Sequence, residues 1–305
     1  MLVFLTGGSG FVGGYILKEL ARKGHATRVL TRTTPREPAV ESGLTYVEGD
    51  VTRRESLRGL LDGCDAVIHL VGIIDEHPAK GITFEHVHLD GTRHVVDEAR
   101  SSGLDRFIQM SANGARPDGV SSYQTSKFRA EEYVKQAGFE HWTIFRPAIA
   151  FGDPGPNKPE FSKRIAQTLV KTFPVLPVPG DGRYAVQPIS IQELAEAFVK
   201  ALDLPSASGR TYCAAGKETL TFDDVLDRIS VALGHEPKPK IHHPLWMVRS
   251  AVRAAARTGM LPISPDQLEM LVEGNTCDSS DFYRDFQVEY RPYSPENLAY
   301  LRRLV

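Results

Sequence analysis

Short apolar runs alternate with segments of helical periodicity along the first half of the chain. The runs are rich in β-branched and aromatic residues, whereas the segments between them carry apolar positions at helical spacing. This alternation predicts βαβ units around a parallel sheet that is buried on both faces. The predicted strands span residues 2–6, 27–31, 45–49, 66–72, 106–111 and 142–148.

The second half of the chain has a different pattern. Proline- and glycine-rich stretches follow residue 151 and indicate loops that cross a surface. The sequence Ser-Pro-Asp-Gln at 264–267 is typical of a helix start. Further helices are predicted at 189–202, 222–233 and 245–258.

The composition is that of an ordinary globular protein. The 305 residues carry 36 basic and 38 acidic side chains, so bulk charge does not favour nucleic acid as a partner. No apolar stretch approaches the roughly 20 residues of a membrane-spanning helix, and no leader pattern precedes the apolar run at Leu2. Cys64, Cys213 and Cys277 are far apart, and we expect reduced thiols. We therefore predict a cytoplasmic protein.

A glycine-rich corner joins the first predicted strand to the first amphipathic segment. Gly7 suits a tight turn, and Gly10 allows the backbone to approach a pyrophosphate. Gly13 suits close packing of the following helix, whose first amide groups would face the phosphates. The corner therefore predicts a dinucleotide site, made by Gly7, Ser9, Gly10, Phe11, Val12 and Gly13.

These features predict an α/β fold, a doubly wound parallel sheet of the Rossmann type, with a smaller C-terminal substrate-binding part. Residues 1–150 are assigned to the dinucleotide-binding domain, which residues 185–215 would complete. Residues 151–184 and 216–305 are assigned to a substrate-binding or lid part.

The corner resembles the cofactor motif of the short-chain dehydrogenase/reductase superfamily, because two residues separate successive glycines. Gly91-Thr92 and the segment Phe145–Gly152 also match motifs of the extended and atypical members. Among these, the chain is similar to the NAD(P)-binding accessory subunit of respiratory complex I and to NAD-dependent epimerases and dehydratases. The resemblance covers residues 1–150 well and the remainder loosely.

The resemblance implies further cofactor contacts at the carboxyl ends of three strands. The residues after the third strand would meet the adenine, and those after the fourth and sixth strands would lie beside the ribose and nicotinamide. These residues are Asp50, Val51, Leu70, Val71, Gly72 and Pro147.

The end of the second strand bears on the form of the cofactor. NAD binders usually place an acidic residue there, whereas this chain has Arg32. A guanidinium pairs well with a 2′-phosphate, so we predict NADP and leave NAD open. The alternative is that Arg32 is a solvated surface residue.

Tyr123 and Lys127 are four residues apart, so on a helix both side chains lie on one face. An ammonium beside a phenol favours the phenolate, and we expect Lys127 to lower the pKa of Tyr123. The phenol would then exchange a proton with an alcohol or carbonyl oxygen. The pair stands where the superfamily carries its catalytic tyrosine and lysine, and the resemblance implies that Lys127 also holds a ribose hydroxyl.

The superfamily also uses a hydroxyl near the end of the fifth strand, where this chain has Ser111. In nucleotide-sugar epimerases that hydroxyl falls one residue later, where this chain has Ala112 followed by Asn113. Three alternatives therefore stay open: Ser111 is catalytic, Asn113 replaces it as a donor, or the proton relay is impaired.

Two classes of function follow. The first is an NAD(P)-dependent oxidoreductase that acts on a small or lipophilic carbonyl or alcohol, with Tyr123 as general acid/base. The second is a structural or assembly protein that binds NADP(H) with little turnover. A nucleotide-sugar epimerase or dehydratase is a third interpretation, which the absence of an evident phosphate clamp disfavours. The expected partner is a small-molecule substrate, and the sequence does not indicate an oligomeric state.

A basic amphipathic helix is predicted at 245–257. Its arginines lie four apart, so it either presents a solvated face or contacts a membrane surface or a partner. We expect Trp246 in the core, and the adjacent His242 and His243 need not face one metal, so no metal site is predicted. The arginines are Arg249, Arg253 and Arg257.

Overall fold

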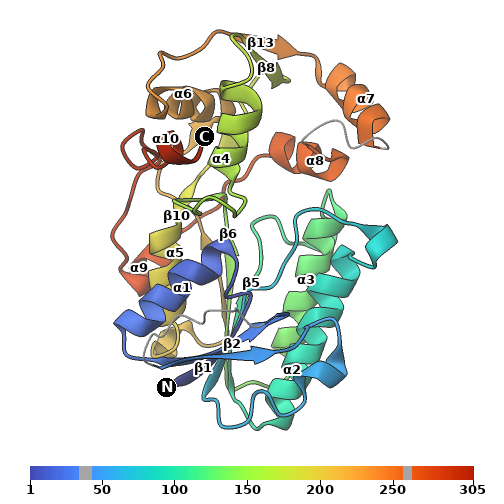
Figure 1. The fold of residues 1–305 in the computed structure, drawn as a ribbon, viewed down its shortest axis with the longest axis vertical. Helices are drawn as coiled ribbons and strands as arrows, with labels where there is room; N and C mark the ends of the chain where they lie inside the picture. The colour runs from blue at the N-terminus through green and yellow to red at the C-terminus, as the bar shows by residue number, and fades with distance from the viewer. Residues whose placement is uncertain (34–42, 257–262) are drawn as a thin grey trace. The chain divides into compact units, whose positions relative to one another are not determined.

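A computed structural model describes residues 1–33, 43–256 and 263–305 (Figure 1). The described chain divides into two compact units. The first unit comprises Met1–Pro147, Leu194–Cys213 and Ser280–Val288. The second comprises Ala148–Glu193, Ala214–Ser279 and Glu289–Val305. The assignment of cofactor binding to one part and substrate binding to another stays a prediction.

A seven-stranded sheet organises the first unit, in the order β11-β6-β5-β4-β1-β2-β3. The neighbouring strands from β3 to β6 pair in parallel, which confirms the predicted doubly wound α/β fold. All six predicted strands are present, and β11 is a seventh that the apolar pattern did not single out. The strands are β1 Leu2–Thr6, β2 Ala26–Thr31, β3 Leu44–Glu48, β4 Ala66–His69, β5 Arg106–Met110, β6 His141–Pro147 and β11 Arg210–Ala214.

Helices cover both faces of this sheet, with α1 on one side and α2 and α3 on the other (Figure 1). The strands are therefore buried on both faces, which explains why they read as continuous apolar runs. Longer helices of this part are α1 Phe11–Arg22, α2 Gly91–Ser101, α3 Ser122–Gln136, α5 Ile191–Lys200 and α9 Ser280–Phe286. Shorter turns are η1 Arg54–Leu57, η2 Pro78–Lys80, η3 Glu85–Asp90 and η5 Pro205–Ala207.

The candidate pair lies on one helix. Helix α3 is capped by Ser121, whose side chain accepts a hydrogen bond from the amide of Gln124. The helix runs from Ser122 to Gln136. As a result, Tyr123 and Lys127 both lie on α3, as their spacing predicted.

An aromatic cluster attaches the later parts of the first unit to β6. Phe145 on β6 packs against Phe198 on α5, with ring centroids 4.4 Å apart, and against Phe286 on α9 at 5.2 Å. Tyr212 on β11 stacks on the same ring at 5.8 Å. This cluster ties chain segments that are distant in sequence to the far side of the sheet from β3.

The strand order reverses between β1 and β4. The chain runs from β1 outward to β2 and β3, and then returns to β4 on the other side of β1. The segments that leave the carboxyl ends of β1 and β4 therefore diverge, and ligands of open α/β sheets bind in the crevice that this reversal creates. The glycine corner follows β1 at this point.

The second unit contains three pairs of short strands and several helices. The predicted helix start at Ser264 is confirmed, because its side chain and that of Gln267 form a capping box. The strand pairs are β7 Ala150–Phe151 with β10 Ile189–Ser190, β9 Ala185–Val186 with β12 Leu220–Thr221, and β8 Leu176–Pro179 with β13 Lys240–His243. The helices are α4 Phe161–Ile165, η4 Ala166–Val170, α6 Phe222–Ala232, α7 Leu245–Ala256, α8 Pro265–Glu273 and α10 Leu301–Leu304.

Helix α7 differs from its prediction in two ways. Trp246 is 69% exposed, so the prediction that it belongs to the core is wrong. Arg249 is not freely solvated, because it forms a two-pronged ion pair with Glu269 on α8, whereas Arg257 lies outside the described residues. Val252 on α7 is buried, whereas Trp246, which lies about 120° away around the helix, is exposed.

The cysteines follow the prediction only in part. Cys64 is a free thiol, whereas Cys213 and Cys277 are disulfide-bonded, so the prediction of three reduced thiols is wrong for these two. The spacing of cysteines along a chain does not show which thiols a fold brings within bonding distance. The cytoplasmic location stays a prediction. Within the described ranges, no helix is both long and apolar enough to cross a bilayer.

Candidate active site

The glycine corner is a tight turn that only glycine can form. Gly7 has a φ of 75°, and its carbonyl accepts a hydrogen bond of 3.0 Å from the amide of Gly10. A Cβ atom on Gly13 would lie 2.3 Å from the Gly7 oxygen and 2.6 Å from Gly8 Cα, closer than packed atoms approach. These contacts let α1 start directly against the turn, as the sequence predicted for Gly13.

The N-terminus of α1 has the properties of an anion site. Among the described residues, no side chain caps this helix at Gly10 and no acidic residue occupies its first turn. The amide groups of the first turn form the positive end of the helix dipole, and no acidic side chain of this turn neutralises it. The glycine corner leaves space that a Cβ atom would fill, and it lies beside this helix start. Such a site fits the diphosphate of a dinucleotide. Ser9 is exposed at this turn, and the Phe11 ring packs on Tyr15.

The corner packs directly against the segment that follows β4. A Cβ on Gly7 would lie 3.2 Å from Leu70, and a Cβ on Gly72 would lie 2.8 Å from Nζ of Lys127. Glycine at position 72 therefore leaves the space that the lysine ammonium occupies. The structure thus brings together three elements that the sequence assigned to one site: the corner, the segment 70–72 and Lys127.

Lys127 is buried at the carboxyl ends of β4 and β5. Its Nζ donates to the carbonyl oxygens of Val71 at 3.3 Å and Met110 at 3.4 Å. Burial lowers the pKa of this ammonium to about 8, although the charge of Glu131 acts in the opposite direction. At neutral pH the side chain is therefore a desolvated cation in the middle of the predicted cofactor cleft.

Tyr123 does not have the lowered pKa that its neighbour predicted. Burial raises the pKa of its phenol to about 12, because the charged form loses its contact with water. The ring is fixed edge-on by Phe84, at a centroid distance of 5.6 Å, and by His88, at 5.3 Å. In this form of the protein the phenol is therefore a neutral proton donor. The expectation of a Lys127-induced phenolate is wrong for it.

Ser111 offers a hydroxyl without a partner. Its amide donates to the carbonyl of Phe145 at 2.7 Å and extends the pairing of β5 with β6 by one step. The side chain is buried, and among the described residues its Oγ has no hydrogen-bond partner. Buried hydroxyls normally have partners, so this oxygen is available to a ligand oxygen in the cleft. Cys213 Sγ lies 3.8 Å from the amide oxygen of Asn113, and whether Asn113 replaces Ser111 as a donor stays a prediction.

Asp50 and Arg32 lie near one another at the ends of β3 and β2. Burial alone would raise the pKa of Asp50, but hydrogen bonds from the amide and hydroxyl of Thr52 lower it below its usual value, helped by Arg32 and Arg53. The side chain of Arg32 is exposed. Val51 is buried under α2, where a Cβ on Gly91 would come within 3.1 Å of its side chain. Whether these residues touch a cofactor stays a prediction, as it does for Pro147 at the end of β6.

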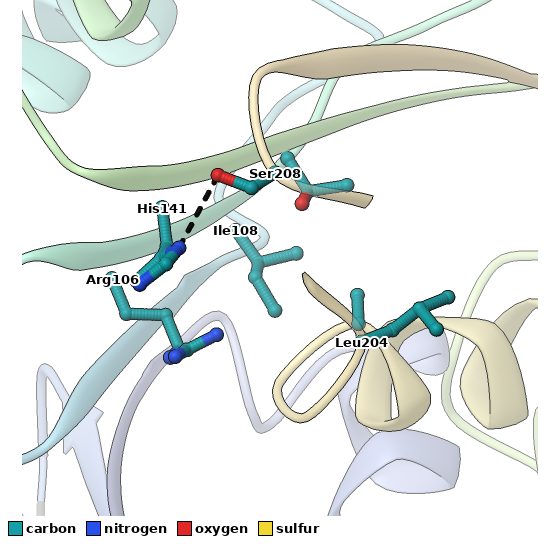
Figure 2. Close-up of a pocket in the computed structure, with 7 residues that line it drawn as sticks. Arg106, Ile108, His141, Leu204 and Ser208 are labelled. Carbon is teal, nitrogen blue, oxygen red and sulfur yellow. Dashed lines mark hydrogen bonds between the residues drawn. The ribbon is translucent and has the colours of Figure 1, made fainter. Parts of the chain in front are cut away.

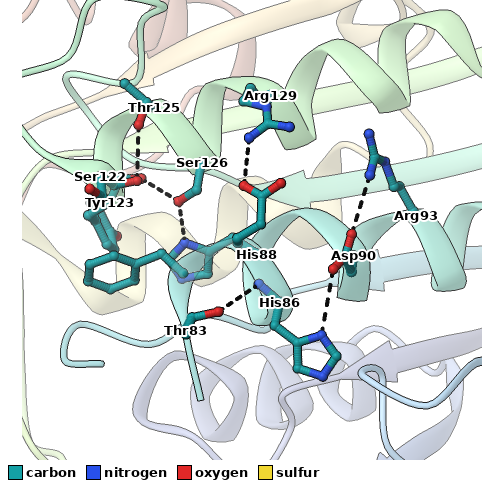
Figure 3. A network of polar contacts seen from close by, with 12 residues as sticks. Thr83, His86, His88, Asp90, Arg93, Ser122, Tyr123, Thr125, Ser126 and Arg129 are labelled. Carbon is teal, nitrogen blue, oxygen red and sulfur yellow. Dashed lines mark hydrogen bonds and ion pairs between the residues drawn. The ribbon is translucent and has the colours of Figure 1, made fainter. Parts of the chain in front are cut away.

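Two buried histidines, neither of which a sequence motif singled out, form hydrogen bonds with residues around the candidate site. His69 Nδ1 lies 2.8 Å from the hydroxyl of Thr6, and its Nε2 lies 3.2 Å from the hydroxyl of Thr92. The Thr92 hydroxyl donates to the backbone carbonyl of His88, whose ring reaches Ser126 on α3 (Figure 3). Burial lowers the pKa of His69 to about 3 and that of His88 to about 2, so both rings are neutral. A polar residue inside an otherwise apolar strand was the available signal for His69.

Two hollows lie away from these residues. The first is lined by Arg106, His141 and Ser208 at the amino ends of β5 and β6, opposite to the end that carries Ser111 (Figure 2). It is too narrow for a water-sized sphere, so it is a packing defect of the first unit. The second is an open hollow of about 550 Å³ in the second unit, lined in part by Arg183 and Tyr184. Within the described ranges, no cluster of histidine, cysteine and acidic side chains could hold a metal ion.

Comparisons with known proteins agree with this geometry. Residues 3–215 match the sequence model of the NAD dependent epimerase/dehydratase family. A ceramide reductase of Caulobacter vibrioides is 33% identical over 178 residues, which are 58% of this chain and 53% of that protein. The mitochondrial NADH-ubiquinone oxidoreductase 40 kDa subunit of Neurospora crassa is 24% identical over 302 residues, which are 96% of this chain and 76% of the subunit. The chain thus spans about half to three quarters of these relatives.

The fold also matches solved structures. The structure of MoeE5 in complex with UDP-glucose and NAD superposes with a TM-score of 0.75 and 15% sequence identity. The alignment covers 100% of this chain and 98% of that one. At this identity the likeness establishes the fold and leaves the chemistry to the residues of the site.

Proposed function

Because this chain belongs to the NAD-dependent epimerase/dehydratase family, we propose that it is an NADP-preferring oxidoreductase that acts on a small or lipophilic carbonyl or alcohol. The observation that carries the proposal is the position of Tyr123 and Lys127 on α3. Lys127 lies against the segment 70–72, which in turn packs on the glycine corner. The relative named a ceramide reductase supports a lipophilic substrate.

In this proposal each residue of the cleft has a separate role in binding or catalysis. The corner and the start of α1 would hold the diphosphate, and Arg32 would hold the 2′-phosphate. When bound, the nicotinamide supplies hydride transfer. Tyr123, as a neutral phenol, would donate a proton to the substrate oxygen in the reductive direction, and Ser111 Oγ would orient that oxygen. Lys127 would hold a ribose hydroxyl of the cofactor, since its ammonium lies beside the segment 70–72. The assignment of residues 151–184 and 216–305 to substrate binding is part of this proposal.

A second function is also supported by a specific observation. The mitochondrial 40 kDa subunit aligns with nearly the whole chain, and its name places it in an assembly rather than naming a substrate of its own. A protein that retains NADP(H) for stability would need the corner and Arg32 but no working phenol. The nucleotide-sugar epimerase alternative is supported by the similar fold of the solved structure of MoeE5 with UDP-glucose and NAD. The sequence disfavours it, because residues that would grip the phosphates of a nucleotide sugar are not evident.

One experiment separates these functions. The purified chain is expected to carry or capture a nicotinamide dinucleotide, identified by mass spectrometry of the released nucleotide. Oxidation of NADPH is then followed by its absorbance with a panel of long-chain ketones, quinones, aldehydes and steroid ketones. Gly13→Val is the control that should not bind the nucleotide, because its side chain would clash with the carbonyl oxygen of Gly7. Capture without turnover on any class favours the assembly protein, and no capture contradicts both.

Replacing Arg32 by alanine is expected to weaken NADPH binding about tenfold and to leave NADH binding unchanged. A hydrogen bond to a charged group typically contributes about 1.5–3 kcal/mol, and this one would exist only with the 2′-phosphate. The measurement is a titration of both cofactors by fluorescence. Arg53→Ala is the matched control, since Arg53 is also exposed and also near Asp50. An equal effect of the two substitutions, or none, removes the proposed role of Arg32.

A further inference from the structure

His88 links the helix of the candidate catalytic pair to the segment that follows β4. Figure 3 shows its contact with Ser126 on that helix. It lies on the π-helical turn η3, where its Nδ1 is 2.9 Å from the hydroxyl of Ser126. That hydroxyl also donates to the carbonyl of Tyr123 at 2.9 Å. On the other side of the ring, the amide of Ile73 donates to Nε2 at 3.0 Å. One imidazole therefore joins α3 to the backbone beside Gly72.

Both nitrogens of the ring have partners. Nδ1 faces the Ser126 hydroxyl, and Nε2 faces the amide of Ile73. The Ile73 carbonyl lies slightly further from the same nitrogen, at 3.2 Å. Burial and the nearby charge of Lys127 keep this ring neutral, so it does not relay protons at neutral pH. Its contribution has to come from geometry.

The same ring contacts Tyr123 directly. The His88 and Tyr123 rings meet edge to face, with centroids 5.3 Å apart and an interplanar angle of 85°. Phe84 stacks on His88 at 5.3 Å and 22°, so the imidazole is held from its other face. A Cβ on Gly72 would approach both Lys127 Nζ, at 2.8 Å, and His88 Nε2, at 3.4 Å. Both nitrogens therefore flank one point of the cleft.

We propose that His88 is a positioning residue of this site, which fixes the Tyr123 ring relative to the backbone of residues 71–73. The π-helical turn supports this role, because such turns inside helices frequently mark functional sites. The inference rests on the proposed function of Tyr123 as proton donor. It adds a residue that takes no part in the proton transfer and determines where the phenol points.

Two substitutions separate the contacts of the ring. His88→Phe keeps the ring and removes both nitrogen contacts, whereas His88→Gln keeps polar atoms and removes the ring. Protein labelled with 3-fluorotyrosine is observed by fluorine NMR, and Tyr123→Phe identifies the Tyr123 resonance. We expect both variants to displace that resonance and to lower kcat about tenfold. NADPH affinity should change much less, because the corner and Arg32 are untouched.

His86→Gln is the matched control, since His86 lies on the same turn and pairs with Asp90 away from the site. A folded His88 variant with an unchanged Tyr123 resonance and unchanged kcat overturns the proposal. Should neither variant fold, Ser126→Ala removes one bond of the link, and an unmoved resonance in that variant overturns it as well. A wild-type chain without turnover refutes the proposed function, and the resonance still decides whether His88 positions the ring.

Discussion

Tyr123→Phe is expected to lower kcat by about 10²- to 10⁴-fold while the nucleotide stays bound, since a positioned general acid contributes that much. Phenylalanine keeps the edge-on contacts with Phe84 and His88 and removes only the hydroxyl. The reductive step would then lack a proton donor, although hydride transfer geometry is preserved. The measurement is the rate of NADPH oxidation with the substrate class that the panel identifies, together with a cofactor titration.

Tyr133→Phe supplies the matched control on the same helix. Its hydroxyl donates to Asp97 at 2.7 Å, outside the cleft, so its loss should leave kcat within about twofold. An oxidoreductase in which Tyr123→Phe retains most of its kcat would need another proton donor, and Ser111, whose Oγ is unpartnered, is the group to replace next. A third outcome is that both variants bind NADPH, but that neither the wild-type protein nor Tyr133→Phe oxidises it with any substrate. That outcome favours the structural or assembly protein.

The sequence specified the sheet and the glycine corner because both depend on local patterns. A strand covered on two faces must be apolar throughout, and a helix that starts against a turn must have glycine where Gly13 stands. These constraints act within a few residues, so periodicity and spacing reveal them. The candidate pair on α3 was accessible for the same reason, since Tyr123 and Lys127 share a helix face by their spacing alone.

The electrostatics of the site could not be predicted in this way. The pKa of Tyr123 is raised by burial, and the rings of Phe84 and His88 that cover it come from another part of the chain. The same holds for His88, whose partners Ser126 and Ile73 lie on separate elements. Pairings between distant segments determine these properties, and a single sequence does not display them.

The surroundings of single residues could not be predicted from the sequence either. A tryptophan is usually buried, yet Trp246 on α7 is exposed. Composition favours reduced cysteines, yet Cys213 and Cys277 are disulfide-bonded. In each case a general tendency was overruled by where the fold places one side chain.

His69 and His88 make the first unit sensitive to acid. Each has a folded pKa far below the ordinary value of 6.5, about 3 for His69 and about 2 for His88, because burial disfavours the charged ring. Between pH 6.5 and these lowered pKa values, the histidines of the unfolded chain bind protons and those of the folded chain do not. The stabilisation is therefore present above about pH 6.5 and is lost as the pH falls below it.

Below pH 6.5 each histidine is expected to lower the free energy of unfolding by about 1.4 kcal/mol per pH unit. Between neutral pH and pH 4.5 the two histidines together would lower it by about 5 kcal/mol. That is a large part of the stability of a typical domain. Glu160 acts in the opposite direction within the second unit, since burial raises its pKa to about 7 and protonation in this range favours its folded form. We therefore expect acid to open the first unit before the second.

Hydrogen exchange followed by mass spectrometry at pH 7 and pH 4.5 tests this order, because it resolves peptides of the two units. After correction for the intrinsic exchange rate, protection of β1, β4 and α2 should fall at pH 4.5 far more than that of α6. His69→Gln offers an amide to the hydroxyls of Thr6 and Thr92 without a titratable ring, so about half of the pH dependence should disappear. Equal acid sensitivity of this variant and the wild type would mean that the buried rings are not the cause.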